Sequence, residues 1–349
     1  MKLLITGGAG FIGSAVVRRA IGLGHQVVNV DVLTYAANLD NVAEAAGSAG
    51  YAFEQADICD GEAMAAIVER HQPDAIIHVA AETHNDRAIE NPLLFVQSNI
   101  VGTAVLLEAA RAYWAGLTGE RRARFRFVHV STDEVFGALG EDGAFDEDSP
   151  YDPSSPYSAS KAAADHLVRA WGRTFGLPVA LTNCANNYGP FQFPEKLIPT
   201  VVSRALEGRS IPVYGQGQQV RDWLHVDDHA DAILTVLDKG RLGETYLIGG
   251  EGTRRNIDLV KTLCAHLDRI SPSNHPYADN ITFVEDRPGH DWRYAINASK
   301  IRRELGWAPK VELDAGLEEV VRWYVEHQDW WRSLRERGHT SERLGLIRS

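Results

Sequence analysis

The sequence has few cysteines and no long apolar run. Its three cysteines, Cys59, Cys184 and Cys264, lack both the paired spacing of a disulfide framework and a neighbouring metal-type cluster. We therefore expect buried thiols, no disulfide and no metal site. No run approaches the length of a membrane span, and glycines interrupt the first apolar stretch where a signal peptide would continue. This pattern predicts a cytoplasmic protein with no membrane partner.

An excess of basic charge is also missing. The chain has 35 Lys and Arg against 47 Asp and Glu, a net charge of −12 at pH 7. Such a balance argues against a nucleic-acid partner, and an anionic ligand would have to meet a local cluster of cations. With 349 residues, 44% of them apolar and 23% charged, the chain is typical of a globular protein of about two domains.

A glycine-rich turn stands near the N-terminus. A short apolar strand over 2–6 precedes it, a helical pattern over 14–23 follows, and the glycines are Gly7, Gly10 and Gly13. Glycines at these places permit a tight turn, close approach of a pyrophosphate and packing of the helix on the sheet. Because both flanking elements are present, the turn predicts a dinucleotide site.

The acidic residue that such a site requires follows at the end of the second predicted strand, 27–30. Asp31 lies 18 residues beyond Gly13, close to where an acid binds the adenine ribose hydroxyls. The next residues, Leu33, Thr34 and Tyr35, include no arginine for a 2′-phosphate. The sequence therefore predicts NAD rather than NADP.

Further along, polar residues follow a buried strand over 125–130 and include Thr132, Asp133 and Glu134. Open parallel sheets bind their ligands at this end of a strand. Tyr157 and Lys161 then stand four apart on a predicted helix, so the ammonium can lie near the phenol. A nearby cation favours the charged form of a phenol. The pair is therefore suited to take a proton from a hydroxyl.

The alternation of strands and helices predicts an α/β fold, a Rossmann-type doubly wound parallel sheet with a smaller C-terminal α/β substrate-binding domain. We place the NAD-binding domain at 1–185, with later segments near 221–248 returning to it. The region 186–349 mainly forms the substrate-binding domain. The apolar helix over 92–114 and the helix beginning at Tyr157 are predicted to form a homodimer interface.

Four cationic residues lie in predicted loops or at helix starts, namely Lys196, Arg221, Arg287 and His290. Together they can clamp a diphosphate, because the guanidinium fork binds phosphate oxygens in pairs. The alternative is that each makes an ordinary surface ion pair. His78 lies inside a predicted strand and is expected to be a hydrogen-bonded core histidine.

These motifs together resemble a known family. The glycine-rich turn with Tyr157-Ser158-Ala159-Ser160-Lys161 is similar to the extended short-chain dehydrogenase/reductase family, and Ser131-Thr132-Asp133-Glu134-Val135 is similar to its dTDP-glucose 4,6-dehydratase branch. Further matches extend over nearly the whole chain, at Leu33-Thr34-Tyr35, Asn186-Asn187-Tyr188-Gly189-Pro190, 194–199, Arg221-Asp222-Trp223 and 286–291.

The resemblance implies a hydro-lyase that uses NAD to convert dTDP-glucose to a 4-keto-6-deoxy sugar, for deoxysugar and dTDP-rhamnose biosynthesis. Its implied catalytic residues are Thr132, Asp133, Glu134, Tyr157 and Lys161. The cofactor residues are Gly7, Gly10, Phe11, Ile12, Gly13, Asp31, Leu33, Thr34, Tyr35, Asp57, Ile58, Ala80, Ala81, Tyr157, Lys161 and Asn187. The substrate residues are His84, Thr132, Asn186, Lys196, Leu197, Arg221, Asn256, Arg287 and His290.

Three residues depart from the family pattern. Asn85 stands where relatives usually have an apolar residue, Phe136 where tyrosine is common, and Trp292 where arginine is common. Two other functions remain open at this point. A sugar-nucleotide 4-epimerase or decarboxylase would need Tyr157, Lys161 and Thr132 but not both carboxyl residues. A non-catalytic NAD-binding regulator would need only the fold.

Overall fold

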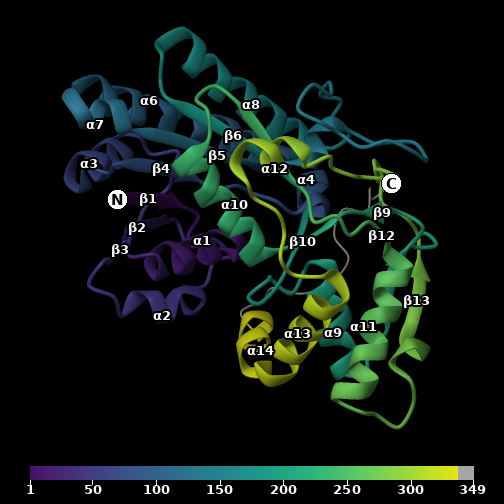
Figure 1. Cartoon of the computed structure of the whole chain (residues 1–349). Helices are drawn as coiled ribbons and strands as arrows, with labels where there is room; N and C mark the ends of the chain where they lie inside the picture. Colours follow the sequence, from purple (N-terminus) through teal and green to yellow (C-terminus); the bar gives the residue numbers. More distant parts are fainter. Residues whose placement is uncertain (337–349) are drawn as a thin grey trace.

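The computed structural model describes residues 1–336, and a parallel sheet forms the centre of this part of the chain (Figure 1). Its strands are β1 (Lys2–Thr6), β2 (Gln26–Asp31), β3 (Tyr51–Gln55), β4 (Ala75–His78), β5 (Arg126–Thr132), β6 (Val179–Cys184) and β11 (Thr245–Ile248). These seven strands lie in the order β11-β6-β5-β4-β1-β2-β3, and every pair is parallel. The predicted doubly wound sheet is confirmed.

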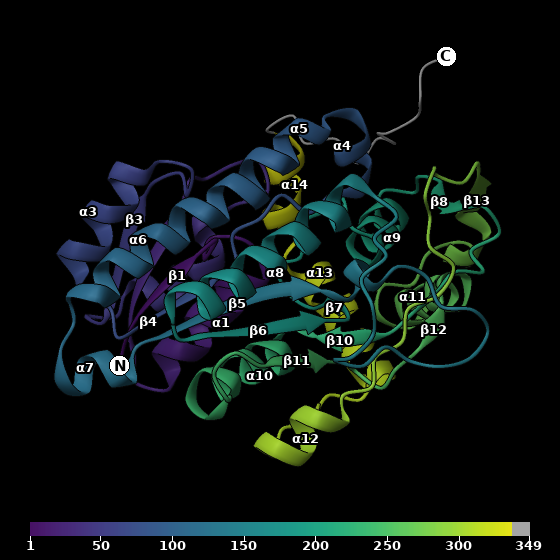
Figure 2. The same ribbon diagram turned by 90° about the horizontal axis from the view of Figure 1, so that it is seen from above.

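Helices cover both faces of the sheet (Figure 2). On one face α3 (Gly61–His71), α6 (Gly102–Gly116) and α8 (Pro156–Phe175) pack side by side, and on the other α1 (Phe11–Gly22) packs against α10 (Val226–Lys239). Because the strands are buried on both sides, they read as nearly continuous apolar runs. The shorter elements are η1 (Leu39–Val42), α2 (Ala43–Ala46), α4 (Asn85–Glu90), α7 (Gly119–Arg124), η3 (Asp133–Phe136), η4 (Tyr277–Asn280) and α12 (Ser299–Leu305).

One continuous helical segment corrects the expectation about membrane spans. It consists of α5 (Pro92–Phe95), a π-helical turn η2 (Val96–Val101) and α6, and its 25 residues are long and apolar enough to cross a membrane by length and composition. The buried side chains of α6 pack against α3 and α8. Leu93, Val96 and Val101 lie exposed on the same segment. The apolar run is long because this helical segment has apolar residues on two faces, only one of which packs against the core.

The chain after β6 builds a second packed unit. Its strands pair as β7 (Asn186–Tyr188) with β10 (Trp223–His225), β8 (Ile211–Tyr214) with β13 (Ile281–Val284), and β9 (Val220–Arg221) with β12 (Arg254–Arg255). Its helices are α9 (Leu197–Leu206), α11 (Asn256–Ile270), α13 (Leu313–Glu326) and α14 (Gln328–Glu336). They enclose an apolar core of their own. The last residues of the predicted second domain, 337–349, lie outside the described residues.

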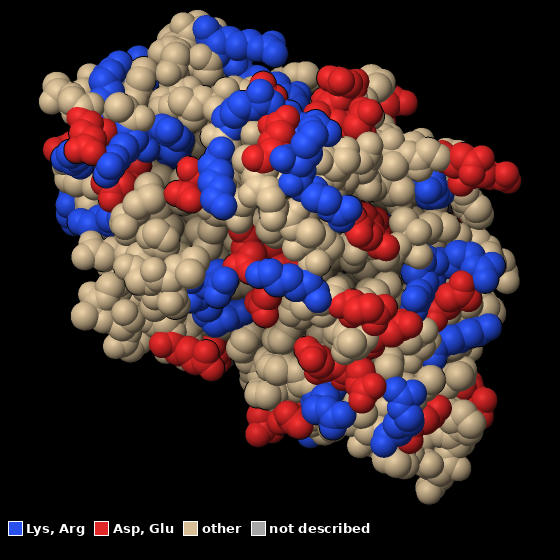
Figure 3. Space-filling model, viewed as in Figure 1, with Lys and Arg blue, Asp and Glu red and all other residues tan. Residues whose placement is uncertain are grey.

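Surface and core agree with the composition. Acidic and basic side chains are intermixed over the face shown in Figure 3. All three cysteines are free; Cys184 and Cys264 are buried as expected, whereas Cys59 is half-buried. His78 is a hydrogen-bonded core histidine, as predicted: its two ring nitrogens lie 2.8 Å from Oγ1 of Thr6 and 3.0 Å from Oγ1 of Thr103.

Candidate active site

The glycine-rich turn after β1 is packed too tightly to accept side chains. A Cβ atom on Gly13 would lie 2.0 Å from the carbonyl oxygen of Gly7, and one on Gly7 would lie 2.7 Å from Cα of Ala80. Gly7 also has a φ of 73°, which glycine adopts without strain. Among residues 1–336 no side chain caps the start of α1. Its free backbone N–H groups are suited to an anionic group such as a pyrophosphate.

Asp31, at the end of β2, joins this turn to the loop that follows β2. Its Oδ2 accepts the backbone N–H of Ala9 at 3.0 Å, and its Oδ1 accepts that of Leu33 at 2.9 Å. Burial raises the pKa of Asp31, and the two N–H groups counteract this effect. A carboxylate has about four acceptor positions, so capacity for ribose hydroxyls remains.

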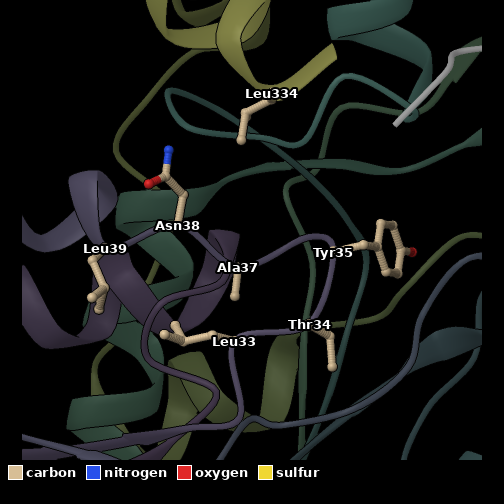
Figure 4. A pocket seen from close by; sticks show the side chains of 7 residues that line it. All are labelled: Leu33, Thr34, Tyr35, Ala37, Asn38, Leu39 and Leu334. Carbon is tan, nitrogen blue, oxygen red and sulfur yellow. The ribbon is translucent and has the colours of Figure 1, made fainter. Parts of the chain in front are cut away.

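A pocket of about 440 Å³ lies beside the same loop (Figure 4). It is lined by Leu33, Thr34, Tyr35, Ala37, Asn38, Leu39 and Leu334. Tyr35 donates its hydroxyl to Oε1 of Glu195 at 2.8 Å, and the guanidinium of Arg87 lies 3.7 Å from its ring centre. Tyr35 therefore connects the predicted cofactor loop to the segment before α9.

The other predicted cofactor residues differ in how their side chains are used. Asp57 accepts the N–H of Cys59 at 2.8 Å and so caps its own loop. Ile58 is buried against Gly102 of α6. Asn187 is buried, and its amide donates to the carbonyl of Ala185. These contacts orient the loops, and contact with a cofactor remains a prediction for them and for Ala81.

The acidic pair lies where β5 ends. The strand extends to Thr132, two residues further than predicted, and Asp133 and Glu134 begin the 3₁₀ helix η3. Asp133 is 1% exposed, and burial followed by the charge of Glu134 raises its pKa well above the usual value. Glu134 is half-buried and accepts Nδ2 of Asn85 at 3.0 Å. The two environments favour a protonated Asp133 beside a more accessible Glu134.

Tyr157 and Lys161 lie on the first turns of α8, which begins with a capping box at Ser155. Both are buried, and Nζ of Lys161 donates to the carbonyl oxygen of Val130 at 2.9 Å. Burial, with the charge of Glu134 as the next cause, raises the pKa of Tyr157 well above its ordinary value. Burial lowers the pKa of Lys161. Burial therefore disfavours the charged form of both side chains.

The sequence interpretation missed Asp165, which lies one helical turn beyond Lys161 and is fully buried. Its Oδ2 accepts hydroxyls from Ser131 at 3.0 Å and Tyr151 at 2.7 Å. Although burial raises its pKa, hydrogen bonding from His129 and the charge of Lys161 leave the pKa of Asp165 lowered. It is therefore an ionised counter-charge for Lys161. The i, i+4 spacing from Lys161 is the sequence signal that could have identified Asp165.

Two of the predicted cationic residues, Arg221 and Lys196, are anchored by backbone carbonyls. Arg221 lies in β9 rather than in a loop, donates Nη2 to the carbonyl of Asp291 at 2.9 Å, and stacks 4.2 Å from the ring centre of Tyr294. Lys196 caps the start of α9, as predicted, and donates Nζ to the carbonyl of Thr83 at 2.8 Å. Such anchoring orders the charged groups before any ligand binds.

Positive charges near His84 and His290 lower the pKa values of these two histidines. Burial, then the charges of Lys196 and Arg287, lowers the pKa of His84 to about 2. Burial, then Arg287 and Arg221, lowers the pKa of His290 to about 4. Cations that face one another in an acidic protein are suited to a multiply charged anion. Two of the four predicted residues also make ion-pair contacts within the protein: Nη1 of Arg287 lies 3.8 Å from Oδ1 of Asp86, and Nδ1 of His290 lies 2.6 Å from Oδ1 of Asp286. With a pKa of about 4, His290 is a neutral donor at pH 7 rather than the predicted cation, and diphosphate binding remains a prediction.

Buried polar atoms without partners line the same region. Oδ1 of Asn186, Oδ1 of Asn256 and Oδ2 of Asp133 find no hydrogen-bond partner among residues 1–336. Leu197 is the first residue of α9, where backbone N–H groups have no partner within the helix. Because buried polar groups are normally satisfied, these atoms are suited to a polar ligand.

The three departures from the family pattern have different surroundings. Phe136 stacks on Phe145 with ring centres 5.1 Å apart. Trp292 is 48% exposed, and its carbonyl accepts the N–H of Val220 at 2.9 Å. Asn85 is the one of the three whose side chain hydrogen-bonds to a predicted catalytic residue, Glu134.

Comparison with known proteins adds a family to this geometry. A family model described as GDP-mannose 4,6 dehydratase matches residues 4–320. The chain is 55% identical over 345 residues to dTDP-glucose 4,6-dehydratase of Shigella flexneri, with 96% of each chain covered. It is 54% identical over 351 residues to dTDP-glucose 4,6-dehydratase 1 of Escherichia coli K12, covering 98% of this chain and 97% of the relative.

Solved structures give the same result. The dTDP-glucose 4,6-dehydratase DesIV of Streptomyces venezuelae, with NAD and TYD bound, has a TM-score of 0.88 and 43% identity, covering 96% of this chain and 100% of that one. A UDP-glucose 4-epimerase of Thermotoga maritima has a TM-score of 0.82 at 29% identity, covering 94% of this chain and 100% of that one. With a family model matched over most of its length and relatives of more than half identity, the chain belongs to the GDP-mannose 4,6 dehydratase family.

Proposed function

We propose that this chain is an NAD-dependent dTDP-glucose 4,6-dehydratase, a hydro-lyase that forms dTDP-4-keto-6-deoxyglucose and water. The observation that carries the proposal is the pair at the end of β5, where Asp133 is buried and favours its protonated form while Glu134 remains accessible. Two carboxyl groups in unlike environments supply an acid and a base. The named relatives at 54–55% identity support the same reaction.

The chain's residues fit the cofactor. The turn around Gly7 and Gly13 has no room for side chains, and the free N–H groups of α1 are suited to its pyrophosphate. Asp31 would hold the adenine ribose, and Tyr157 with Lys161 would face the nicotinamide ribose. When bound, NAD supplies the oxidant for C4 of the sugar and later the hydride for C6.

Tyr157 is the base of the first step. Its phenolate oxygen takes the proton of the 4-hydroxyl and becomes the neutral phenol, while C4 is oxidised to a ketone. Lys161, whose charge is balanced by Asp165, favours the phenolate before this transfer. The hydroxyl of Thr132, which donates to Asp133 at 3.2 Å, lies at the same strand end and would bind the sugar. Burial raises the pKa of Tyr157, so the base role requires a nearby positive charge, which Lys161 supplies.

Elimination follows because a ketone at C4 acidifies the proton on C5. Glu134 takes that proton, the electron pair of the C5–H bond forms the C5–C6 double bond, and the 6-hydroxyl leaves with a proton from Asp133 as water. The raised pKa of Asp133 favours the protonated form that this step requires. Reduction at C6 and reprotonation at C5 by Glu134 complete a reaction with no net redox change.

The second unit would bind the nucleotide. Arg221, Arg287 and His290 would clamp the diphosphate, with Lys196 and His84 nearby, and the free amide oxygens of Asn186 and Asn256 would accept hydrogen bonds from the substrate. This division assigns 1–185, with β11 and α10, to the cofactor and most of 186–336 to the substrate. The base of the nucleotide is inferred from the named relatives.

A 4-epimerase is the second candidate, because an epimerase shares the fold at 29% identity. It would use Tyr157 and Lys161, yet it gives no role to a buried, protonated Asp133 beside Glu134. A non-catalytic regulator would not need the observed placement of these four side chains, Asp133, Glu134, Tyr157 and Lys161. We therefore favour the dehydratase.

We also infer that the protein is a cytoplasmic homodimer. The exposed apolar residues Leu93, Val96 and Val101 lie on the long helical segment beside α8, and such contiguous apolar surface favours association. Sedimentation equilibrium tests this point: a single-chain mass would contradict it.

The deciding experiment is a panel of nucleoside-diphosphate sugars incubated with the protein and NAD, followed by mass spectrometry. We expect a product lighter by one water from dTDP-glucose. A product of unchanged mass with inverted C4 would favour the epimerase, and absence of any product would favour the regulator.

A further inference from the structure

Asn85, the first residue of α4, connects two separate parts of the proposed catalytic machinery. Its Nδ2 donates to Oε2 of Glu134 at 3.0 Å, and its Oδ1 accepts the hydroxyl of Ser155 at 3.0 Å. Glu134 is 49 positions away in the chain and Ser155 is 70 positions away. One amide side chain therefore joins the end of β5 to the start of α8.

The orientation of this amide follows from the chemistry of its neighbours. An ionised carboxylate can only accept hydrogen bonds, so the amide nitrogen must face Glu134. The amide oxygen then faces Ser155, whose Oγ also accepts the backbone N–H of Ser158 at 3.1 Å as the cap of α8. Rotating the amide by half a turn would set two acceptors against each other at Glu134. The side chain is thus held in one orientation.

Glu134 depends on this contact for its position. Its backbone N–H is held by Oγ1 of Thr132 at 3.2 Å, but no other side chain in residues 1–336 donates a hydrogen bond to its carboxylate. A half-buried glutamate has three rotatable side-chain bonds and would otherwise sample several rotamers. Asn85 holds Oε2 and leaves Oε1 available to receive a proton.

We propose that Asn85 is a positioning residue that aims Glu134 at the C5 proton and couples the base to the helix that carries Tyr157. This inference rests on the proposed function. An apolar side chain at this position would offer no donor to the carboxylate, so the contact depends on the amide of Asn85. Misplacing a reacting group by about 1 Å can slow a step roughly a hundredfold.

The test replaces Asn85 by Val, which removes the donor, and by Asp, which keeps the shape and the bond to Ser155 but carries no donor. Turnover is measured with unlabelled dTDP-glucose, with the 4-deuterated sugar and with the 5-deuterated sugar. We expect turnover to fall roughly ten- to hundredfold in both variants, the usual effect of losing a hydrogen bond to a charged group. The isotope effect of the 5-deuterated sugar should rise, while that of the 4-deuterated sugar should not.

The isotope effect is a ratio of two rates on one preparation, so a partly unfolded variant cannot imitate the change. Asn91→Val is the matched control, because Asn91 lies at the other end of α4 with an exposed side chain that makes no cap hydrogen bond within the described residues. It should behave like the unsubstituted protein.

Two results would overturn the inference. If the unsubstituted protein makes the dehydrated product while both Asn85 variants keep its turnover and its 5-deuterium isotope effect, Asn85 does not position the base. If the unsubstituted protein makes no such product from dTDP-glucose, the proposed function fails, and the role of Asn85 fails with it.

Discussion

Asp133→Asn removes the proposed acid with little change of shape. Asp133 is 1% exposed, and its Oδ1 accepts the hydroxyl of Thr132 at 3.2 Å, a contact that an amide oxygen can keep. Because burial favours the neutral carboxylic acid, the neutral amide is a close mimic of the native group. What the variant loses is the proton given to the leaving 6-hydroxyl. Product formation should therefore slow by the ~10²–10⁴-fold that is typical of losing a general acid.

The assay separates this step from the others. Product is followed by its mass, and exchange of solvent deuterium into C5 of recovered sugar is followed by nuclear magnetic resonance. Oxidation at C4 and removal of the C5 proton need Tyr157 and Glu134, so exchange should continue in Asp133→Asn while product formation stalls. Product at the unmodified rate would refute the acid role. Loss of exchange together with product would place Asp133 in substrate binding instead.

The same variant tests the environment of Asp133 through stability. Burial raises the pKa of Asp133 in the folded protein above its unfolded value of about 3.9. The folded chain therefore keeps a proton that the unfolded chain has already lost, so stability is full below about pH 4 and falls as the pH rises through the folded pKa. The slope is at most about 1.4 kcal/mol per pH unit. Asp133→Asn should abolish this contribution, and parallel pH profiles of urea unfolding for the two proteins would contradict the raised pKa.

Three other substitutions test the remaining roles. Glu134→Gln keeps an oxygen for Asn85 but removes the base. Solvent deuterium should therefore no longer enter C5, and the rate of product formation should fall ~10²–10⁴-fold. Continued exchange would exclude Glu134 as the base. Tyr157→Phe removes one hydroxyl from a buried ring, so oxidation at C4 should cease while the melting temperature stays close to that of the parent. An active variant would exclude Tyr157. Asp31→Ala removes the acceptor of two backbone N–H groups. Calorimetric titration should then show NAD affinity weakened roughly tenfold or more. Unchanged affinity would contradict the ribose assignment.

Features that depend only on residues close in sequence could be predicted without the structure. The strand, turn and helix around Gly7 and Gly13 follow from local composition, and steric contact at 2.0 Å explains why glycine is needed. The spacing of Tyr157 and Lys161 places them on one helix face whatever the rest of the fold does. Alternating strands and helices likewise predicted the parallel sheet, because each element buries an apolar face of recognisable period.

Tertiary structure alone decided which distant groups contact one another and how far they are shielded from water. The hydrogen bond from Asn85 to Glu134 and that from Tyr35 to Glu195 join residues 49 and 160 positions apart, and no periodic pattern connects such pairs. Burial sets the opposite pKa shifts of Tyr157 and Lys161, since hydration depends on everything packed around a side chain. The apolar segment Pro92–Gly116 has the composition of a membrane span, and it becomes a core helix because α3 and α8 pack against one of its faces.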